Sequence, residues 1–568
     1  MYVLGVNCWL HDTAAALLRD GAVVAALEEE RWYRDDKHTS VFPARSIRWC
    51  LQAAQDAELA IDHVAINLSP LRCFGDARGR LDVLFSKGGL RDRRNRRAYR
   101  HLRRFGERTA REIRHVLAAA GLGRRFTFHE VPHHDAHAAS AFNLSGFEEA
   151  AILTVDGLGE WATTTSSMGR GTRIERLATI GLPHSLGTFY ASFTDYLGFR
   201  RNNDEYKVMG LASFGDPARF RGVFRELIRT TEDGGFEIDT SPFELSAGVL
   251  FPGQGLERLF EGPSRVPESE LGDRHHDIAA ALQEATEEVG VHLARHLQRM
   301  TGSTNLCLAG GVALNCVMNT RILAETDFEA LYVQPAAYDA GGSLGAASWA
   351  THQILGLPRE AVMDRTSYGP AYGDHEIEAL LRDGMLRFRR SDDIAQDTAQ
   401  LLADGKIVGW FQGGAEFGPR ALGHRSILAD PTRDDMQDHV NRRVKHREDF
   451  RPFAPSVIHE AYRSYFDTEV DDPFMTKVVP VRADQRAKLP AITHIDGTAR
   501  VHTVKRETNP LYHRMIEEFG RLRGIPVVLN TSFNVRGEPM VLTPQDALRC
   551  FFGTGIDHLA LGSFIVDK

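Results

Sequence analysis

The sequence predicts an α/β protein with a duplicated N-terminal domain and a second α/β domain after it. The chain has 568 residues, enough for about three or four folding units at roughly 150 residues each. A pattern of strand, loop, strand, turn and strand appears at residue 2 and returns at residue 151. Glycine, proline and tyrosine cluster between residues 355 and 373, where we place the domain boundary.

The first copy of the repeat occupies the start of the chain. Residues 2–7 (YVLGVN) read as an apolar strand that ends in a loop at 8–12. Residues 13–18 read as a second strand, and 22–28 as a third strand after a turn at 19–21.

The second copy has the same order. Residues 151–160 (AILTVDGLGE) form a strand that ends in a polar, glycine-rich loop, and 161–169 form the next strand. A turn at 170–171 leads into a third strand at 172–180. In such a duplication the two tight loops face each other across a cleft, which suits a phosphorylated ligand because backbone N–H groups point into it.

Further elements complete both domains. Residues 276–300 have helical periodicity, and strands are expected at 305–309 and 331–333. The second domain opens with a helix capped near Asp374, and its expected strands are 406–411, 453–458 and 525–530. The predicted domains are 1–355 and 370–568.

Composition narrows the class of protein. Hydrophobic residues make up 43% and charged residues 25%, as in soluble globular proteins. The net charge of −8 argues against a general nucleic-acid binder. The N-terminus has no signal-peptide pattern and no window is apolar enough to span a membrane, so we expect a cytoplasmic protein. The six cysteines form no CxxC pair and read as free thiols: Cys8, Cys50, Cys73, Cys307, Cys316 and Cys550.

An arginine-rich run lies between the two copies, at 91–97 and 103–104. A solvated surface is one interpretation, and an anion-attracting rim or a partner-binding surface is the other. Residues 240–275 match no expected element. Both segments are candidates for shaping the choice of substrate.

A histidine pair predicts a metal site. His133 and His137 stand four residues apart, so on a helix both imidazoles lie on one face. A metalloprotease needs Glu after the first His, and His134 occupies that position. Asp156 and Asp339 sit at predicted strand ends and complete a mixed nitrogen and oxygen set suited to Fe(II), Mn(II) or Zn(II). Structural histidines are the alternative.

Two glycine-rich or polar loops are further candidates. In 310–315 (GGVALN) a double glycine lets a nucleotide approach the backbone before a helix begins. His11, in the first tight loop beside Asp12, is a candidate general base for an alcohol nucleophile. Ordinary turn chemistry and loop capping are the respective alternatives.

Cations in Gly/Pro-rich loops of the second domain predict a pocket for phosphorylated ligands, with surface charge as the alternative. They are Arg420, Arg425, Lys445, Arg447, Arg451, Arg500, Lys505, Arg506 and Arg536, with Asn530 and Ser532 after a predicted strand.

These residues resemble the O-carbamoyltransferase family that includes NodU, CmcH and TobZ, from Gly5 to about Val566. The most specific strings are HDTAAAL (11–17), EEER (28–31), HHDAHAAS (133–140), VDGLGE (155–160), YKVMGLASFG (206–215), AGGVALNCVMN (309–319), FGPRALGHRSILADP (417–431), FRPFAPS (450–456) and LNTSFNVRGEP (529–539). The resemblance implies an actin-like/sugar-kinase (ASKHA) N-terminal domain. It also implies a YrdC-like C-terminal domain.

The resemblance also implies site residues. The implied metal ligands, with iron the ion, are His133, His137, Asp156 and Asp339, and His11 is the implied base. Implied contacts to the adenylate are Lys207, Gly311 and Asn315. The implied site for ATP and carbamoyl phosphate comprises Arg420, Lys445, Arg447, Arg451, Arg500, Asn530, Ser532 and Arg536.

The implied reaction has two steps. The C-terminal domain makes carbamoyladenylate from ATP, with Mg²⁺, and carbamoyl phosphate, and the N-terminal domain transfers the carbamoyl group to a hydroxyl of a small-molecule acceptor. An antibiotic or another secondary metabolite is the expected acceptor, and a homodimer is compatible with the sequence. A tRNA-modifying carbamoyl transferase and a non-catalytic nucleotide sensor are the alternatives.

Overall fold

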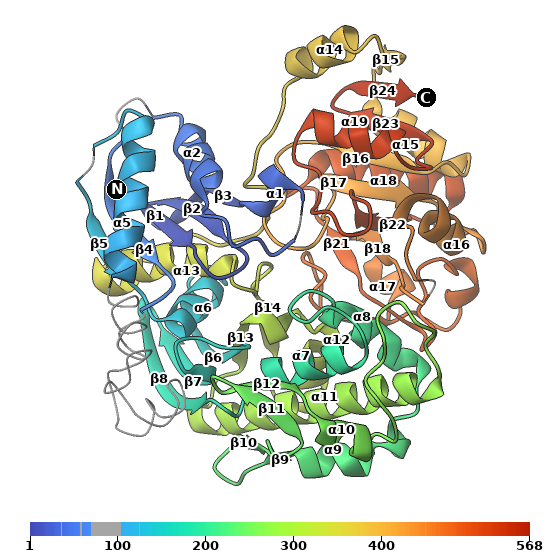
Figure 1. Ribbon diagram of the computed structural model, residues 1–568. Helices are drawn as coiled ribbons and strands as arrows, with labels where there is room; N and C mark the ends of the chain where they lie inside the picture. The colour runs from blue at the N-terminus through green and yellow to red at the C-terminus, as the bar shows by residue number, and fades with distance from the viewer. Residues whose placement is uncertain (36, 57–58, 70–103, 124, 449) are drawn as a thin grey trace. The chain divides into compact units, whose positions relative to one another are not determined.

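The computed structural model describes residues 1–35, 37–56, 59–69, 104–123, 125–448 and 450–568 (Figure 1). They form two compact units: unit 1 is Met1–Glu29 with His38–Met363, and unit 2 is Glu30–Lys37 with Asp364–Lys568. Residues 30–37 thus belong to unit 2 although the residues on both sides of them belong to unit 1. A single boundary between 355 and 370 does not predict this. Cys73 and residues 91–103 of the arginine-rich run lie outside the described residues.

The first sheet of unit 1 has the order β3-β2-β1-β4-β5. Its strands are β1 (Tyr2–Asn7), β2 (Ala14–Arg19), β3 (Ala22–Glu28), β4 (Ile61–Ile66) and β5 (Thr127–Glu130). Strands β1, β2 and β3 pair antiparallel, whereas β1, β4 and β5 pair parallel.

The second sheet repeats this topology, with the order β14-β13-β6-β7-β8. Its strands are β6 (Glu149–Val155), β7 (Ala162–Arg170), β8 (Arg173–Gly181), β13 (Asn305–Ala309) and β14 (Ala330–Val333). Strands β6, β7 and β8 pair antiparallel, and β6, β13 and β14 pair parallel. Two sheets with the same strand order and directions confirm the duplicated α/β domain that the repeat predicted, and they agree with the actin-like fold that the resemblance implies.

Two helices pack between these sheets (Figure 1). Helix α13 (Gly341–Trp349) lies against β1, β2 and β4, and also against α6 (His133–Phe142), which lies against β6, β7 and β13. Glycines allow this close approach. A Cβ on Gly5 would stand 1.9 Å from the Ser343 carbonyl oxygen, and one on Gly345 would stand 1.8 Å from that of Ala136.

Gly345→Ala is expected to lower the free energy of unfolding by about 3 kcal/mol or more, because the added methyl group overlaps a helix backbone that cannot move alone. Urea denaturation followed by circular dichroism measures it. Gly222→Ala is the matched control, since Gly222 lies in α9 (Arg221–Leu227) and an added Cβ there meets nothing within 4 Å. Equal stability of the two variants would contradict this packing argument.

Other helices cover the outer faces of the sheets. Helices α2 (Ala44–Ala53) and α5 (Phe105–Ala119) bury their apolar sides against the first sheet. The segment predicted to be helical at 276–300 is α11 (Asp273–Thr301), which contacts β6, β7 and α12 (Cys316–Glu325).

The chain between β8 and α11, which includes the unassigned 240–275 segment, forms small elements around an aromatic cluster. They are α7 (Leu186–Tyr196), α8 (Glu205–Leu211), α9, β9 (Ile228–Thr230), β10 (Phe236–Ile238), β11 (Phe243–Ser246), β12 (Val249–Pro252) and α10 (Gln254–Leu259). At its centre Phe193 lies 4.8 Å from Phe224 and 5.3 Å from Phe260, measured between ring centroids.

Unit 2 is built on a mixed sheet of eight strands in the order β15-β24-β23-β16-β17-β22-β18-β21. The strands are β15 (Phe388–Arg390), β16 (Val408–Phe411), β17 (Arg425–Ala429), β18 (Ala454–Ile458), β21 (His502–Val504), β22 (Val527–Ser532), β23 (His558–Leu561) and β24 (Phe564–Asp567). The expected strands at 406–411, 453–458 and 525–530 are β16, β18 and β22, which confirms an α/β domain here.

Both faces of this sheet are buried. Trp410 packs in a core with α15 (Ile394–Ala403) and α18 (Pro510–Arg523), whereas its neighbour Phe411 packs in the core on the opposite face. The alternation follows from the two-residue period of a strand. Further helices of unit 2 are α1 (Glu30–Tyr33), α14 (Asp374–Asp383), α16 (Met436–Val440), α17 (Tyr462–Tyr465) and α19 (Pro544–Phe552); short strands β19 (Val479–Pro480) and β20 (Thr498–Ala499) pair with each other.

The cysteines of the described residues are free and buried: Cys8, Cys50, Cys307, Cys316 and Cys550. Burial raises the pKa of Cys307 to about 12, so its thiol is unreactive at neutral pH. Within the described ranges, no helix has the length and apolarity that crossing a membrane requires.

Candidate active site

Helix α6 carries the predicted histidine pair at its N-terminal end, one turn apart. The Nε2 atoms of His133 and His137 lie 3.0 Å apart, and both side chains are buried. The Nδ1 atom of His133 faces the carbonyl oxygen of Asn67 at 3.3 Å, so Nε2 is the atom turned to the cluster. Glu160 holds the helix in place, because its carboxylate accepts from the backbone N–H groups of His133 at 3.1 Å and Ser69 at 2.8 Å.

Two buried carboxylates complete the cluster. Asp156 follows β6, and its Oδ2 lies 2.9 Å from His133 Nε2 and 3.1 Å from His137 Nε2. Asp339 does not lie at a strand end as expected. It sits just before α13, and its Oδ1 lies 3.3 Å and 3.6 Å from the same two nitrogen atoms. The packing of α13 on α6 therefore joins the two halves of the cluster.

These four side chains fit a divalent transition metal. Bonds of about 2.1 Å place neighbouring ligand atoms about 3.0 Å apart at right angles and about 3.4 Å apart at the tetrahedral angle. The measured separations of 2.9 to 3.6 Å cover that range. Two imidazoles and two carboxylates favour Fe(II), Mn(II) or Zn(II) over Ca²⁺. Structural histidines explain the cluster less well, since both Nε2 atoms face one carboxylate oxygen.

The carboxylates of Asp156 and Asp339 determine the protonation of His133. Burial lowers the pKa of His133, but the charges of Asp339 and Asp156 outweigh it and hold that pKa well above its ordinary value. His134 shows the contrast. Its Nδ1 contacts the Thr154 hydroxyl at 2.6 Å and its Nε2 donates to the Ala162 carbonyl at 3.0 Å, and burial holds its pKa well below the ordinary value. His134 is therefore a neutral structural residue.

Metal affinity is expected to rise with pH from about pH 6 to about pH 8, because the cation must displace the proton that a raised pKa keeps on His133. Calorimetric titrations with Zn²⁺ in two buffers of different ionisation enthalpy measure the protons released. Titration of a chelator in the same buffers provides the control. Affinity that does not change with pH, without proton release, would contradict a metal bound through His133.

The glycine-rich loop at 310–315 also contacts Asp156. Asp156 Oδ1 accepts from the backbone N–H groups of Gly157 at 2.8 Å and Gly311 at 3.0 Å. Gly311, expected to contact an adenylate, therefore also orients a cluster carboxylate. Asn315 caps α12 by accepting from the Met318 N–H, and its amide pairs with that of Gln283.

Lys207 lies on α8, where its Nζ is 3.1 Å from Asp204 Oδ2. The sulfur atoms of Met209 and Cys316 lie 4.0 Å apart, so α8 adjoins the start of α12 next to Asn315. The three residues expected at the adenylate thus come from neighbouring elements of unit 1.

His11 borders the cluster of two histidines and two aspartates. Its Nδ1 lies 2.7 Å from Asp12 Oδ2, and its Nε2 lies 3.8 Å from Asp339 Oδ2. The His11 side chain is 50% exposed, whereas that of His137 is 1% exposed, so the open side of the cluster is the side of His11. Burial lowers the pKa of His11, but Asp339 and Asp12 outweigh it and raise that pKa to about 10. A cation on the carboxylates would offset their charge and lower that pKa.

Lys445 is a buried cation of the predicted phosphate pocket. Its Nζ donates to the Ser532 carbonyl oxygen, to the Asn534 carbonyl at 3.0 Å and to Asn534 Oδ1 at 2.8 Å. Burial and the nearby charge of Arg447 hold its pKa well below the ordinary value. In this structure Lys445 therefore fixes the loop after β22, with the Ser532 hydroxyl 3.3 Å away.

Three arginines lie around Lys445. Arg447 donates through Nε to Asn441 Oδ1 at 2.8 Å and lies 4.4 Å above the Phe453 ring. Arg451 and Arg536 flank Glu448, at 3.6 Å and 3.7 Å from its carboxylate oxygens. The structure therefore brings together Lys445, Arg447, Arg451, Ser532 and Arg536, which we call the Lys445 cluster.

Asn530 lies on β22 just before that loop. Its Nδ2 donates to the Ala421 carbonyl at 3.0 Å, next to Arg420, and to the Ser456 hydroxyl at 2.9 Å. Among the described residues, the buried Oδ1 of Asn530 and the buried Nε of Arg500 have no hydrogen-bond partner. A pocket for a polar ligand would use both atoms.

Other predicted cations do not join the Lys445 cluster. Arg425 is fully buried; its guanidinium donates to the carbonyls of Gln412 at 2.8 Å and Pro370 at 2.9 Å and stacks 3.6 Å above Phe411. Burial lowers its pKa to about 10, and its role is structural. Lys505 pairs with Asp471 at 2.6 Å and Arg506 with Glu517 at 3.4 Å, both near the surface.

Sequence reasoning missed several residues that hold these loops. Glu416, fully buried, accepts from the N–H groups of Leu422, His424 and Arg425 and so shapes the loop that carries Arg420. Glu160 and Asn7 hold the α6 and His11 loops. Glu160 is the last residue of the VDGLGE string (155–160), and its place in that string is the one sequence feature that could have indicated its role.

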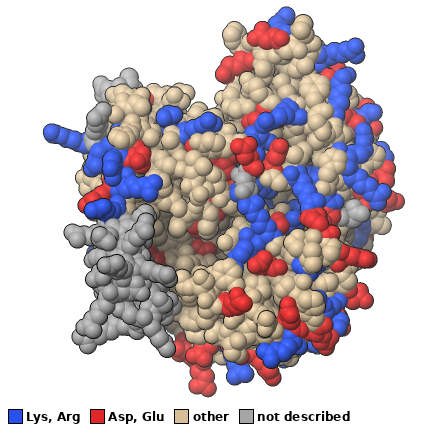
Figure 2. Space-filling view, viewed as in Figure 1, with Lys and Arg blue, Asp and Glu red and all other residues tan. Residues whose placement is uncertain are grey.

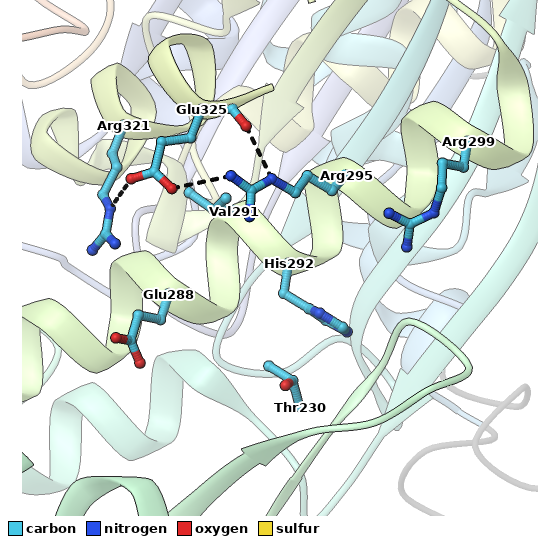
Figure 3. Close-up of a pocket in the computed structure, with 8 residues that line it drawn as sticks. All are labelled: Thr230, Glu288, Val291, His292, Arg295, Arg299, Arg321 and Glu325. Atoms are coloured by element: carbon cyan, nitrogen blue, oxygen red, sulfur yellow. Dashed lines mark hydrogen bonds and ion pairs between the residues drawn. The ribbon is translucent and has the colours of Figure 1, made fainter. Parts of the chain in front are cut away.

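Two surface hollows lie away from these residues. One, of about 410 Å³, is lined by Thr230, Glu288, Val291, His292, Arg295, Arg299, Arg321 and Glu325 (Figure 3). Arg295 and Arg321 both bind Glu325 there, at 3.2 Å and 2.5 Å. The other, of about 270 Å³, is lined by Tyr372, Asp374, Ile377, Ile394, Phe411, Gln412, Gly413, Leu511, Gly562 and Ser563. Neither hollow contains a predicted site residue.

Both units match models of one protein family. Residues 2–348 match the family model described as carbamoyltransferase N-terminus, and residues 399–568 match the one described as carbamoyltransferase C-terminus. Protein sll1178 of Synechocystis sp. is 40% identical over 100% of this chain and 97% of its own. Nodulation protein NolNO of Sinorhizobium fredii is 40% identical over 99% of this chain and 80% of its own. The 3′-hydroxymethylcephem-O-carbamoyltransferase of Amycolatopsis lactamdurans is 28% identical over 79% of this chain and 82% of its own.

Proposed function

Because the chain belongs to the carbamoyltransferase family, we propose that it is an ATP-dependent O-carbamoyltransferase acting on a small-molecule hydroxyl. The observation that carries this proposal is the buried set of two histidines and two aspartates beside the half-exposed His11. One of its relatives is named as an O-carbamoyltransferase of a hydroxymethyl group, which supports a hydroxyl acceptor.

In the transfer step, His133, His137, Asp156 and Asp339 would hold a divalent cation, with Fe(II) our first choice. Such a cation polarises a carbonyl and stabilises the charge that develops on its oxygen. His11 Nε2 takes the proton of the acceptor hydroxyl. The hydroxyl oxygen attacks the carbamoyl carbon of carbamoyladenylate, the bond from that carbon to the phosphate oxygen breaks, and AMP leaves. Gly311, Asn315 and Lys207 are the proposed contacts to the adenylate.

Unit 2 would supply the activated carbamoyl group. Carbamoyl phosphate and water give carbamate and phosphate, and attack of carbamate on the α-phosphorus of ATP, bound with Mg²⁺, gives carbamoyladenylate and pyrophosphate. The Lys445 cluster, with Arg420, Arg500 and Asn530, is the proposed site. Arginine binds phosphate in a bidentate way, and a dry site strengthens each contact.

A tRNA substrate is the main alternative. Figure 2 shows Lys and Arg interspersed with Asp and Glu over the visible face, in keeping with the net charge of −8. Such a mixed surface supports a small-molecule acceptor, because nucleic-acid binding rests on concentrated positive charge. Buried free thiols support a reducing compartment such as the cytoplasm. A non-catalytic sensor is the other alternative, and ATP turnover separates it from an enzyme.

Incubation with ATP, carbamoyl phosphate and a panel of hydroxylated natural products tests the proposal. Mass spectrometry should find one acceptor whose mass rises by a carbamoyl group, with pyrophosphate and AMP formed in equal amounts. Omission of ATP provides the control. A protein that forms no pyrophosphate under these conditions, or that carbamoylates tRNA with a steep salt dependence, would contradict the proposed function.

A further inference from the structure

We propose that His38 is a positioning residue for carbamoyl transfer: it holds the carboxylate of Asp12, which in turn fixes the orientation and tautomer of His11. This inference rests on the proposed function, and it assigns a role to a side chain that lies outside the motifs of the sequence analysis. It follows from the contacts of one buried carboxylate with two imidazoles in unit 1.

Asp12 lies between two histidines. Its Oδ2 is 2.7 Å from His11 Nδ1, and its Oδ1 makes a still closer contact with His38 Nδ1. The Asp12 side chain is almost fully buried, at 4% exposed. Burial raises its pKa, but His38 and His11 outweigh burial and hold that pKa below the ordinary value. An ionised carboxylate only accepts hydrogen bonds, so each imidazole donates from Nδ1.

The tautomer of His11 follows from that arrangement. With its proton held on Nδ1 by Asp12, the neutral ring has its lone pair on Nε2. Nε2 is also the atom turned to the metal cluster, 3.8 Å from Asp339 Oδ2. A ring turned the other way would present N–H where a base must accept a proton. Asp12 can hold His11 in one orientation only if Asp12 itself is held, and His38 occupies its other oxygen.

The backbone conformations of Asp12 and His38 support a functional role for this pair. Asp12 and His38 both have positive φ values, 55° and 59°, in the left-handed region that costs a side-chain-bearing residue roughly 1–2 kcal/mol. Such strain persists where surrounding contacts enforce it and gathers at functional sites. Here Asn7 Nδ2 donates to the carbonyls of His11 at 3.0 Å and Asp12 at 2.8 Å. The Thr13 N–H donates to the Thr39 carbonyl at 3.3 Å, which ties the two segments together.

His38 also contacts the segment that carries a metal ligand. Its ring packs edge-on against Tyr338, with centroids 6.4 Å apart, and Tyr338 precedes Asp339. The Tyr338 hydroxyl donates to Glu28 Oε1 at 2.9 Å, and both residues are buried. His38 therefore spans the distance between the His11 loop and the start of α13. Because Asp12 is the residue that His38 and His11 share, we expect a change at His38 to act on His11 through Asp12.

Three variants separate the hydrogen bond from backbone strain. His38→Gly relieves the positive φ but removes the donor. His38→Asn keeps a side-chain N–H near the position of Nδ1 and also tolerates that backbone. We expect His38→Gly to lower kcat for transfer about 10- to 100-fold, as loss of an orienting partner does, with acceptor KM, metal content and pyrophosphate formation unchanged. His38→Asn should recover most of that loss. His115→Ala, at an exposed position, is the control and should behave as the unchanged protein.

A second measurement needs no activity. In the zinc-loaded protein with ¹⁵N-labelled histidine, the His11 resonances are those that disappear in His11→Asn. His11 should show a slowly exchanging Nδ1–H in the unchanged protein and in His38→Asn, but not in His38→Gly. Transfer and spectra that are the same in His38→Gly as in the unchanged protein would overturn the inference, as would His38→Asn behaving like His38→Gly. If the unchanged protein forms no carbamoylated product, the proposed function fails, and the spectra still decide the role of His38.

Discussion

His137→Ala is expected to lower metal affinity by 10²-fold or more and to abolish carbamoyl transfer, while pyrophosphate formation in unit 2 continues. His137 Nε2 is 3.0 Å from His133 Nε2 and 3.1 Å from Asp156 Oδ2, so it would supply one of the four proposed ligand atoms. Loss of a residue that only orients a ligand typically costs about 10- to 100-fold in metal affinity, and loss of a ligand costs at least as much. Alanine is the best helix former, so α6 should remain folded.

Metal content after gel filtration, the circular dichroism spectrum and both half-reactions measure the outcome. The matched control is His134→Gln, on the same turn of α6. His134 bonds to Thr154 and Ala162 and does not face the cluster, and Gln can keep one of these bonds. It should bind metal normally. Full metal content and full transfer in His137→Ala, or loss of metal in both variants, would show that the cluster does not bind the catalytic ion.

Local patterns predicted the parts of the fold that depend on local chemistry. The repeat at residues 2 and 151 predicted two equivalent sheets, and the spacing of His133 and His137 predicted that one helix face would carry both. These inferences succeed because strand alternation and the helical period are properties of neighbouring residues.

Contacts across long stretches of sequence were not predictable in the same way. Gly5 and Gly345 look like any glycines, and only the packing of α13 between β1 and α6 explains their lack of a side chain. Glu30–Lys37 joins unit 2 through Arg31, which donates to the Gly418 carbonyl, and Arg34, whose guanidinium lies 2.7 Å from Glu538. Nothing in that octapeptide indicates partners hundreds of residues away.

In the candidate site too, the sequence predicts the type of side chain, whereas its surroundings depend on long-range contacts. Arg420 lies in the loop before β17 and Arg425 is the first residue of β17, yet both have the same chemistry, and burial against Phe411 makes Arg425 structural. Lys445, a predicted phosphate ligand, is also buried, but its Nζ binds acceptors of the loop after β22 that carries Ser532. Residue type therefore predicts which side chains can bind an anion, whereas burial and existing partners decide which ones are available to do so.

Separate loss of the two half-reactions is the expected result of substitutions in the two units. His11→Asn keeps a donor near the position of Nδ1, which bonds to Asp12 at 2.7 Å, but has no Nε2. Transfer should fall about 10²- to 10⁴-fold, as expected for a missing general base, with pyrophosphate formation retained. Arg447→Ala should instead reduce pyrophosphate formation by about 10²-fold or more, because a dry arginine on a phosphate contributes roughly 3 kcal/mol.

Arg447 also lies 4.4 Å above the Phe453 ring, so its loss affects packing as well as charge. Arg447→Lys keeps the charge without the planar contact, and Arg442→Ala removes an exposed arginine of the same region that pairs with Asp438. If charge on phosphate is what matters, Arg447→Lys should retain part of the pyrophosphate activity and Arg442→Ala all of it. Pyrophosphate and carbamoylated product are assayed separately in each variant. Proportional loss of both products in His11→Asn, or normal pyrophosphate formation in Arg447→Ala, would mean that the chemistry is not divided between the two units.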